Sequence, residues 1–142
     1  MEKLDEVLFY TLEKSIKSYR QFAQKQITNA GFDITIDQWL ILQTIQENAT
    51  YSQQQIAEKV FKDFASVTRM IELLVKKGLL QRDFHEEDRR RFKLTLTETG
   101  IKIIADVQPI IQQNRQQALQ SFSEPDVDAF RKYLITLINN CQ

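Results

Sequence analysis

Four basic side chains fall within five residues of one strongly charged segment: Arg89, Arg90, Arg91 and Lys93. Arginine at the tip of a hairpin suits the narrow, electronegative minor groove of A·T-rich DNA. If the segment enters a strand, Arg91 and Lys93 share its outward face and would contact phosphates. Residues 86–88 are acidic, however, so the simpler alternative is a solvated charge run.

A second polar set lies at the start of the helix expected after Asp63. Ser66, Thr68 and Arg69 occupy its first turns, where side chains of a helix in the major groove reach base edges and phosphates. Arg69 can offer two parallel donors to a guanine or clamp a phosphate, and the hydroxyls can bond either partner less selectively. Taken alone, Arg69 is better explained as a solvated residue or an ion-pair partner. The neighbouring elements favour DNA contact.

Three further residues are candidate phosphate contacts. Gln53 and Gln54 open the preceding helix, whose amide-rich N-terminus can receive a phosphate, and Lys62 lies in the following turn. The alternative for each is plain surface, because single exposed Lys and Gln residues are common there.

Helical spacing dominates the segments that position these side chains. Apolar residues recur every three or four positions over Leu4–Ile27, and Gly31 is a suitable C-terminal cap. Capping signatures at Thr35–Gln38 and Ser52–Gln55 open two more helices, and Asp63 is a plausible N-cap for a third.

Alternation replaces helical spacing after the third of these helices. Residues 80–84 and 92–96 read as two half-buried strands, with the charged segment 86–90 as the turn between them. A long helix follows, in which Pro109 removes a backbone donor and predicts a kink or break. Ser123 is the expected cap of a last helix.

These elements predict a mainly α (α+β) fold in a single domain, 1–142, with a winged helix-turn-helix over 35–97. The flanking helices, 1–31 and 98–142, carry apolar stripes longer than so small a domain can cover. Intertwining with a second copy of the chain would bury these stripes. A dimer would also match DNA sites that consist of two half-sites related by two-fold symmetry. We therefore predict a homodimer held by the flanking helices. The alternative is packing within one chain.

The amino-acid composition limits where the protein can be located and which cofactors it can hold. Apolar residues make up 42% and charged residues 27%, with 19 basic and 19 acidic side chains, so any DNA-facing charge must be concentrated on one surface. No apolar run approaches the roughly 20 residues that span a bilayer. The N-terminal stretch contains acidic residues and does not fit a signal peptide, so we expect a cytoplasmic location. One cysteine, Cys141, and one histidine, His85, argue against a disulfide or a metal site, and no cofactor is expected.

The segment Ile36–Ile104 resembles the MarR/SlyA family of transcription regulators. The resemblance is carried by an ordered motif series: Ile56-Ala57, Thr68-Arg69, Lys77-Gly78-Leu79, Asp88-Arg89-Arg90, and Leu96-Thr97 with Gly100. It implies a winged helix within a triangular, two-fold symmetric dimer, and a repressor of transcription that binds a palindromic operator. It also implies that Arg90 is the minor-groove arginine and that Asp88 orients it through an ion pair.

Relatives in this family are often released from DNA by small aromatic or phenolic molecules bound between the dimerisation helices and the winged helix. Five aromatic residues could line such a cleft here: Phe9, Tyr10, Tyr19, Phe22 and Trp39. Aromatic residues at helical spacing are more often plain core. Peroxide-sensing relatives use a first-helix cysteine and zinc-sensing relatives use histidine-rich sites, neither of which this sequence has.

Two other function classes compete with this interpretation. An enzyme is disfavoured, because the sequence has no glycine-rich phosphate loop, no spacing that suggests a nucleophile–base pair and no metal-ligand set. A winged helix that binds only protein, with the basic wing against an acidic partner, is the more serious alternative. Specific, salt-sensitive binding to an inverted repeat distinguishes the DNA reader from that module.

Overall fold

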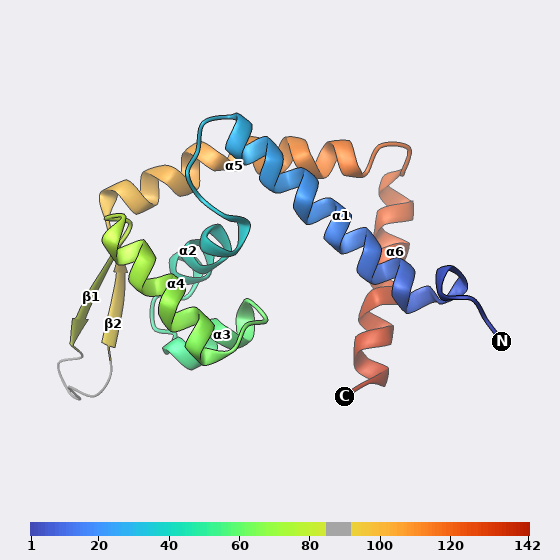
Figure 1. Ribbon diagram of the computed structural model, residues 1–142, viewed down its shortest axis with the longest axis horizontal. Helices are drawn as coiled ribbons and strands as arrows, with labels where there is room; N and C mark the ends of the chain where they lie inside the picture. Colours follow the sequence, from blue (N-terminus) through green and yellow to red (C-terminus); the bar gives the residue numbers. More distant parts are fainter. Residues whose placement is uncertain (85–91) are drawn as a thin grey trace.

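The computed structural model describes residues 1–84 and 92–142. The elements follow in the order η1 (Leu4–Glu6), α1 (Leu8–Asn29), α2 (Ile36–Glu47), α3 (Gln53–Lys59), α4 (Phe64–Lys76), β1 (Leu80–Phe84), β2 (Phe92–Leu96), α5 (Glu98–Ala118) and α6 (Glu124–Asn140). In Figure 1, α2, α3, α4 and the hairpin form one lobe, and α5 extends away from it above. The helix α1 crosses beside α5, and α6 turns downward beyond the far end of α5.

The predicted caps explain where these helices begin. The hydroxyl of Thr35 accepts from the Gln38 amide at 3.0 Å, and the Gln38 side chain accepts from the Thr35 amide at 3.1 Å. Ser52 and Gln55 make the same reciprocal pair at 3.2 and 2.8 Å. Each pair satisfies two backbone groups at a helix start, which fixes the entry of α2 and α3.

The first helix begins later than its apolar stripe predicts. Leu4–Glu6 form a 3-10 turn, and Val7 is extended with φ −78° and ψ 121°, so α1 starts at Leu8. The Glu6 carboxylate accepts from the Lys3 amide at 3.0 Å, which closes the short turn on itself. Val7 is β-branched, so it loses little stability by adopting an extended backbone conformation instead of a helical one. The prediction of a continuous helix from Leu4 is therefore wrong in its first turn.

The helix α5 runs through Pro109 without ending, so the break expected there does not occur. Proline deprives one carbonyl of its donor, but the side chain of Pro109 lies on the exposed face. Val107 and Ile111 on either side are buried in the core, and this packing holds the two halves of the helix in one element.

The core lies where α2 and α4 pack under α5. Its fully buried side chains include Ile41 and Leu42 of α2, Val67 and Ile71 of α4, and Val107 of α5. None of the helices in residues 1–84 and 92–142 is both long and apolar enough to cross a membrane.

The two strands form the predicted antiparallel hairpin. Leu80 pairs with Leu96 at the inner end, where Leu80 is buried, and Phe84 pairs with Phe92 at the outer end, where both rings are exposed. The two rings lie 5.5 Å apart, and the Arg82 guanidinium lies 4.8 Å from the centre of the Phe92 ring. These contacts stiffen the outer end of the hairpin, which the core does not reach.

The turn between α3 and α4 contains a strained residue. Phe61 has φ +61° and is 92% exposed. For an L-residue with a Cβ, this left-handed conformation costs about 1–2 kcal/mol. Phe61→Gly should therefore raise the free energy of unfolding by about 0.5–1 kcal/mol, after allowing for the added freedom of glycine in the unfolded chain.

Urea denaturation followed by circular dichroism measures this gain. Phe61→Ala is the matched control, because it removes the exposed ring but keeps the Cβ and hence the strain. Equal stability of the glycine and alanine variants would contradict the assignment of strain to this turn.

Candidate nucleic-acid interface

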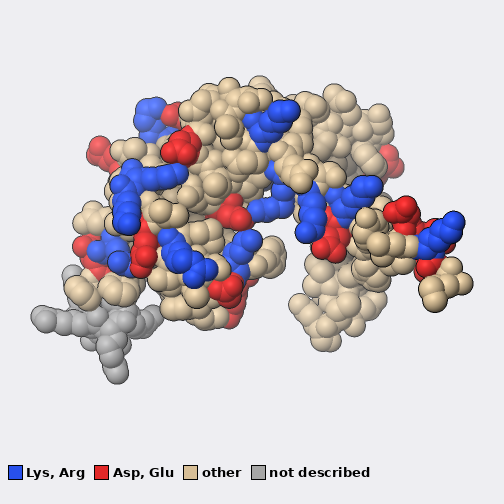
Figure 2. All heavy atoms as spheres, in the orientation of Figure 1, with Lys and Arg blue, Asp and Glu red and all other residues tan. Residues whose placement is uncertain are grey.

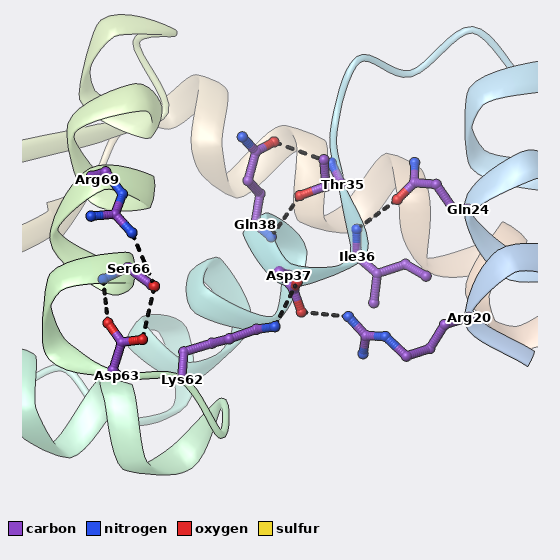
Figure 3. A network of polar contacts seen from close by, with 10 residues as sticks. All are labelled: Arg20, Gln24, Thr35, Ile36, Asp37, Gln38, Lys62, Asp63, Ser66 and Arg69. Atoms are coloured by element: carbon purple, nitrogen blue, oxygen red, sulfur yellow. Dashed lines mark hydrogen bonds and ion pairs between the residues drawn. The ribbon is translucent and has the colours of Figure 1, made fainter. Parts of the chain in front are cut away.

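Asp63, Ser66 and Arg69 form a chain of polar contacts at the start of α4. The Asp63 carboxylate accepts from the Ser66 amide at 2.7 Å and from the Ser66 hydroxyl at 3.1 Å, and Arg69 Nη2 donates to Ser66 Oγ at 3.2 Å (Figure 3). The two bonds from Ser66 hold the pKa of Asp63 below its usual value, and the charge of Arg69 adds to the effect. The cap therefore remains charged at neutral pH and is lost only as the pH falls below the ordinary aspartate range. This arrangement presents the exposed guanidinium beside the exposed end of α4.

The helix α3 is tied to α4 by Gln53 and Thr68. The Gln53 side-chain amide donates to the Thr68 hydroxyl, which in turn donates to the Phe64 carbonyl at 2.9 Å. Gln54 lies one position further on and is exposed, with its amide 3.4 Å from the Glu58 carboxylate. The structure thus brings Gln53 together with Thr68, while Gln54 stays on the surface of α3.

Lys62 points away from the polar chain on α4. Its ammonium lies 3.5 Å from the Asp37 carboxylate at the start of α2, which Arg20 of α1 contacts from the other side at 2.5 Å (Figure 3). The sequence predicted Lys62 as a phosphate contact, and its pairing with Asp37 was missed. The missed signal is the spacing of Arg20 and Gln24, two polar residues one turn apart on the face of α1 that meets α2.

The predicted wing residues are only partly within the described chain. Lys93 lies on β2, is exposed, and faces Asp83 across the hairpin. His85 and the predicted DNA contacts Asp88, Arg89, Arg90 and Arg91 lie outside the described residues.

The base of the wing is locked to the start of α5. The Thr97 amide donates to the Leu79 carbonyl at 3.2 Å, and the Thr97 hydroxyl donates to the Gly78 carbonyl at 2.6 Å. Thr97 also caps α5 by accepting from the Gly100 amide at 3.0 Å. These bonds fix the direction in which the hairpin leaves the lobe.

The five aromatic residues predicted to line a ligand cleft have different surroundings. Trp39 is 6% exposed, lies in the core, and has an Nε1 with no hydrogen-bond partner among the described residues. Phe9 is 60% exposed, whereas Tyr10, Tyr19 and Phe22 are half-buried. A hollow of about 490 Å³ lies between α1 and the start of α2, but its lining residues, which include Arg20, Ile36 and Asp37, contain none of the five aromatic residues.

Charged side chains cover only part of the visible surface, and where they occur the two signs are mixed. Figure 2 shows basic and acidic side chains interspersed over the lobe and along α1, while the visible surface of α6 is largely uncharged. On the face seen in Figure 2, a DNA interface of the described residues depends on individual cations, such as Arg69 at the start of α4.

Known proteins resemble this chain in sequence. The MarR family profile matches residues 34–92. A putative transcriptional regulatory protein for the hcr operon of Thauera aromatica is 33% identical over 133 residues, which cover 94% of this chain and 76% of that protein. This relative is named as a regulator of transcription and not as an enzyme.

Solved structures share the fold. BpsR of Bordetella bronchiseptica, whose DNA binding is regulated by 6-hydroxynicotinic acid, superposes with a TM-score of 0.87 at 20% identity, over 96% of each chain. A variant of MarR from E. coli, complexed with operator DNA, superposes with a TM-score of 0.84 at 20% identity, over 97% of this chain and 99% of that one. The six helices with a two-stranded hairpin match the predicted winged-helix fold. The chain therefore belongs to the MarR family of winged-helix regulators of transcription.

Proposed function

We propose that the chain is a homodimeric repressor that reads an inverted repeat. Residues 35–97 form its DNA-binding part, and residues 1–31 and 98–142 form its dimerisation part. The observation that carries the proposal is the polar chain from Asp63 through Ser66 to Arg69 at the exposed end of α4. Repression rests on the family resemblance. A regulator of this kind acts where the chromosome lies, so we place it in the cytoplasm.

Unpaired apolar faces on the terminal helices support the dimer. On α1, Leu8 and Ile16 are 63% and 53% exposed, and on α6, Phe130 and Ile138 are 52% and 51% exposed. The helix α6 contains no buried residue at all. Apolar surface of this extent is usually covered by a partner, and a second copy would bring the same faces together by two-fold symmetry.

The DNA contacts divide by role. Arg69, Ser66 and Thr68 face the major groove, Gln53 and Gln54 contact phosphate at the start of α3, and Arg91 and Lys93 contact phosphate from the wing. Arg90, oriented by Asp88 and beside Arg89, enters the minor groove. Paired lobes would place such contacts in two half-sites about 10 base pairs apart.

Selection from a random-sequence DNA library with the wild-type protein tests the proposal. We expect the bound duplexes to converge on an inverted repeat, and a reporter gene placed downstream of that repeat to be repressed. Convergence on a single asymmetric site, or no convergence, would contradict a two-fold reader. Activation of the reporter would contradict repression.

A small organic effector forms a second part of the proposal. The buried Trp39 Nε1 is a donor with no partner among the described residues, and an acceptor on an aromatic ligand could satisfy it. The neighbour BpsR responds to 6-hydroxynicotinic acid, which makes this compound a suitable first probe. Release of the selected duplex by the acid, with quenching of Trp39 fluorescence, would support an effector site there. No effect on either signal would contradict this compound as the effector.

A further inference from the structure

The Asp37 carboxylate joins three segments that are far apart in the sequence. It lies in the first turn of α2, and it contacts Arg20 of α1 at 2.5 Å and Lys62 of the α3–α4 turn at 3.5 Å (Figure 3). Its side chain is 24% exposed, less than either cation. One carboxylate thus links the proposed dimerisation helix to the residue that precedes the cap of α4.

The start of α2 is held on α1 by a second clamp beside this link. Gln24, one turn after Arg20, accepts from the Ile36 amide at 2.9 Å and donates to the Ile34 carbonyl at 3.0 Å. With α2 fixed in this way, Asp37 has little freedom to follow a movement of Lys62. The link can therefore transmit the position of α1 to the turn that starts α4.

We propose that Asp37 is a positioning residue for DNA binding: through Lys62 it fixes the recognition helix α4 relative to α1. This inference rests on the proposed homodimer, in which the α1 helices belong to the shared part and the α4 helices read separate half-sites. The angle between α1 and α4 in each subunit then sets the separation of the two recognition helices. Asp37 consequently governs which half-site spacing the dimer accepts.

Asp37→Asn is the most direct variant, because it keeps the shape of the side chain and removes its charge. Arg20 and Lys62 are then two neighbouring cations with no anion between them, so the turn should move away from α1. We expect affinity for a duplex with one half-site to stay within about twofold of wild type. Affinity for the selected inverted repeat should fall about tenfold.

Spacing preference is the readout that a purely structural defect would not reproduce. The selected repeat is compared with duplexes in which one base pair is inserted or deleted between the half-sites. The wild type should lose much affinity on both altered duplexes, whereas Asp37→Asn should discriminate less. Asp37→Glu should restore the wild-type preference, and Asp33→Asn is the matched control, because it removes an exposed carboxylate that lies outside both proposed parts and pairs with Lys77.

The outcomes separate this inference from the proposed function. A wild-type protein with no preference for two half-sites over one would contradict the homodimeric reader itself. A wild type that prefers two half-sites, with an Asp37→Asn variant of equal affinity and equal spacing preference, would overturn only the role of Asp37.

Lys62→Gln should behave as Asp37→Asn does. If it instead weakens half-site binding and lowers the salt slope by about one, Lys62 is a phosphate contact and the link is refuted.

Discussion

Gly100→Ala is expected to lower the free energy of unfolding by about 3 kcal/mol or more. A Cβ at this position would lie 2.1 Å from the Leu79 carbonyl oxygen and 3.1 Å from its carbon. Both are backbone atoms, so no side-chain rotation can relieve the overlap, and α5 must move away from the base of the wing. That movement also strains the bond from the Thr97 amide to the same carbonyl.

Gly31→Ala is the matched comparison for this variant. Gly31 has φ +92°, but a Cβ added there would meet no atom within 4 Å, so alanine adds only backbone strain of about 1 kcal/mol. Urea denaturation at one protein concentration should rank Gly100→Ala well below Gly31→Ala. Equal losses for the two variants would contradict the close approach of Leu79 as the reason for glycine at position 100.

Arg69→Ala is expected to weaken binding to the selected repeat by about 1–3 kcal/mol for each half-site, which is a loss of roughly fivefold to 150-fold per half-site. The guanidinium lies at the exposed end of α4, held by Ser66, and can form two parallel bonds to a guanine. Binding to a scrambled duplex should fall much less, because that binding depends on phosphate contacts alone.

Two variants sharpen the interpretation of Arg69. Arg69→Lys keeps the positive charge but lacks the two parallel N–H donors of the guanidinium. It should therefore recover binding to scrambled DNA without recovering the preference for the selected repeat over scrambled DNA. Lys102→Ala removes one positive charge from α5 and should leave both affinities unchanged. Fluorescence anisotropy on the two duplexes provides the comparison, and equal losses of Arg69→Ala on both would contradict base reading by this residue.

Local signals made most of the fold predictable. Capping pairs such as Thr35 with Gln38 act over three residues, and alternation over 92–96 reports burial on one face of a strand, so each can be recognised without knowing the fold. The same reasoning missed the late start of α1 at Leu8, and of the kink or break expected at Pro109, the break does not occur. Val7 follows a short local turn that Lys3 and Glu6 close, whereas the continuity of α5 at Pro109 depends on tertiary packing, because the residues on either side of it are buried.

The candidate site was predictable only where its contacts are local. Asp63, Ser66 and Arg69 lie within two turns at the start of α4, so their closeness follows from helix geometry. Asp37 and Arg20 are 17 residues apart and meet only because α1 crosses the start of α2. The approach of Gly100 to Leu79 likewise depends on how α5 docks, although the motif series had already marked this glycine.

The mass of the complex between the wild-type chain and the selected duplex, determined by native mass spectrometry, tests the central claim most directly. The account predicts two chains on each duplex and stronger binding to it than to a scrambled duplex. It also predicts that affinity falls at least tenfold between about 50 mM and about 200 mM salt. A complex with one chain on each duplex, or equal binding to the scrambled duplex, would contradict a two-fold, sequence-specific DNA reader.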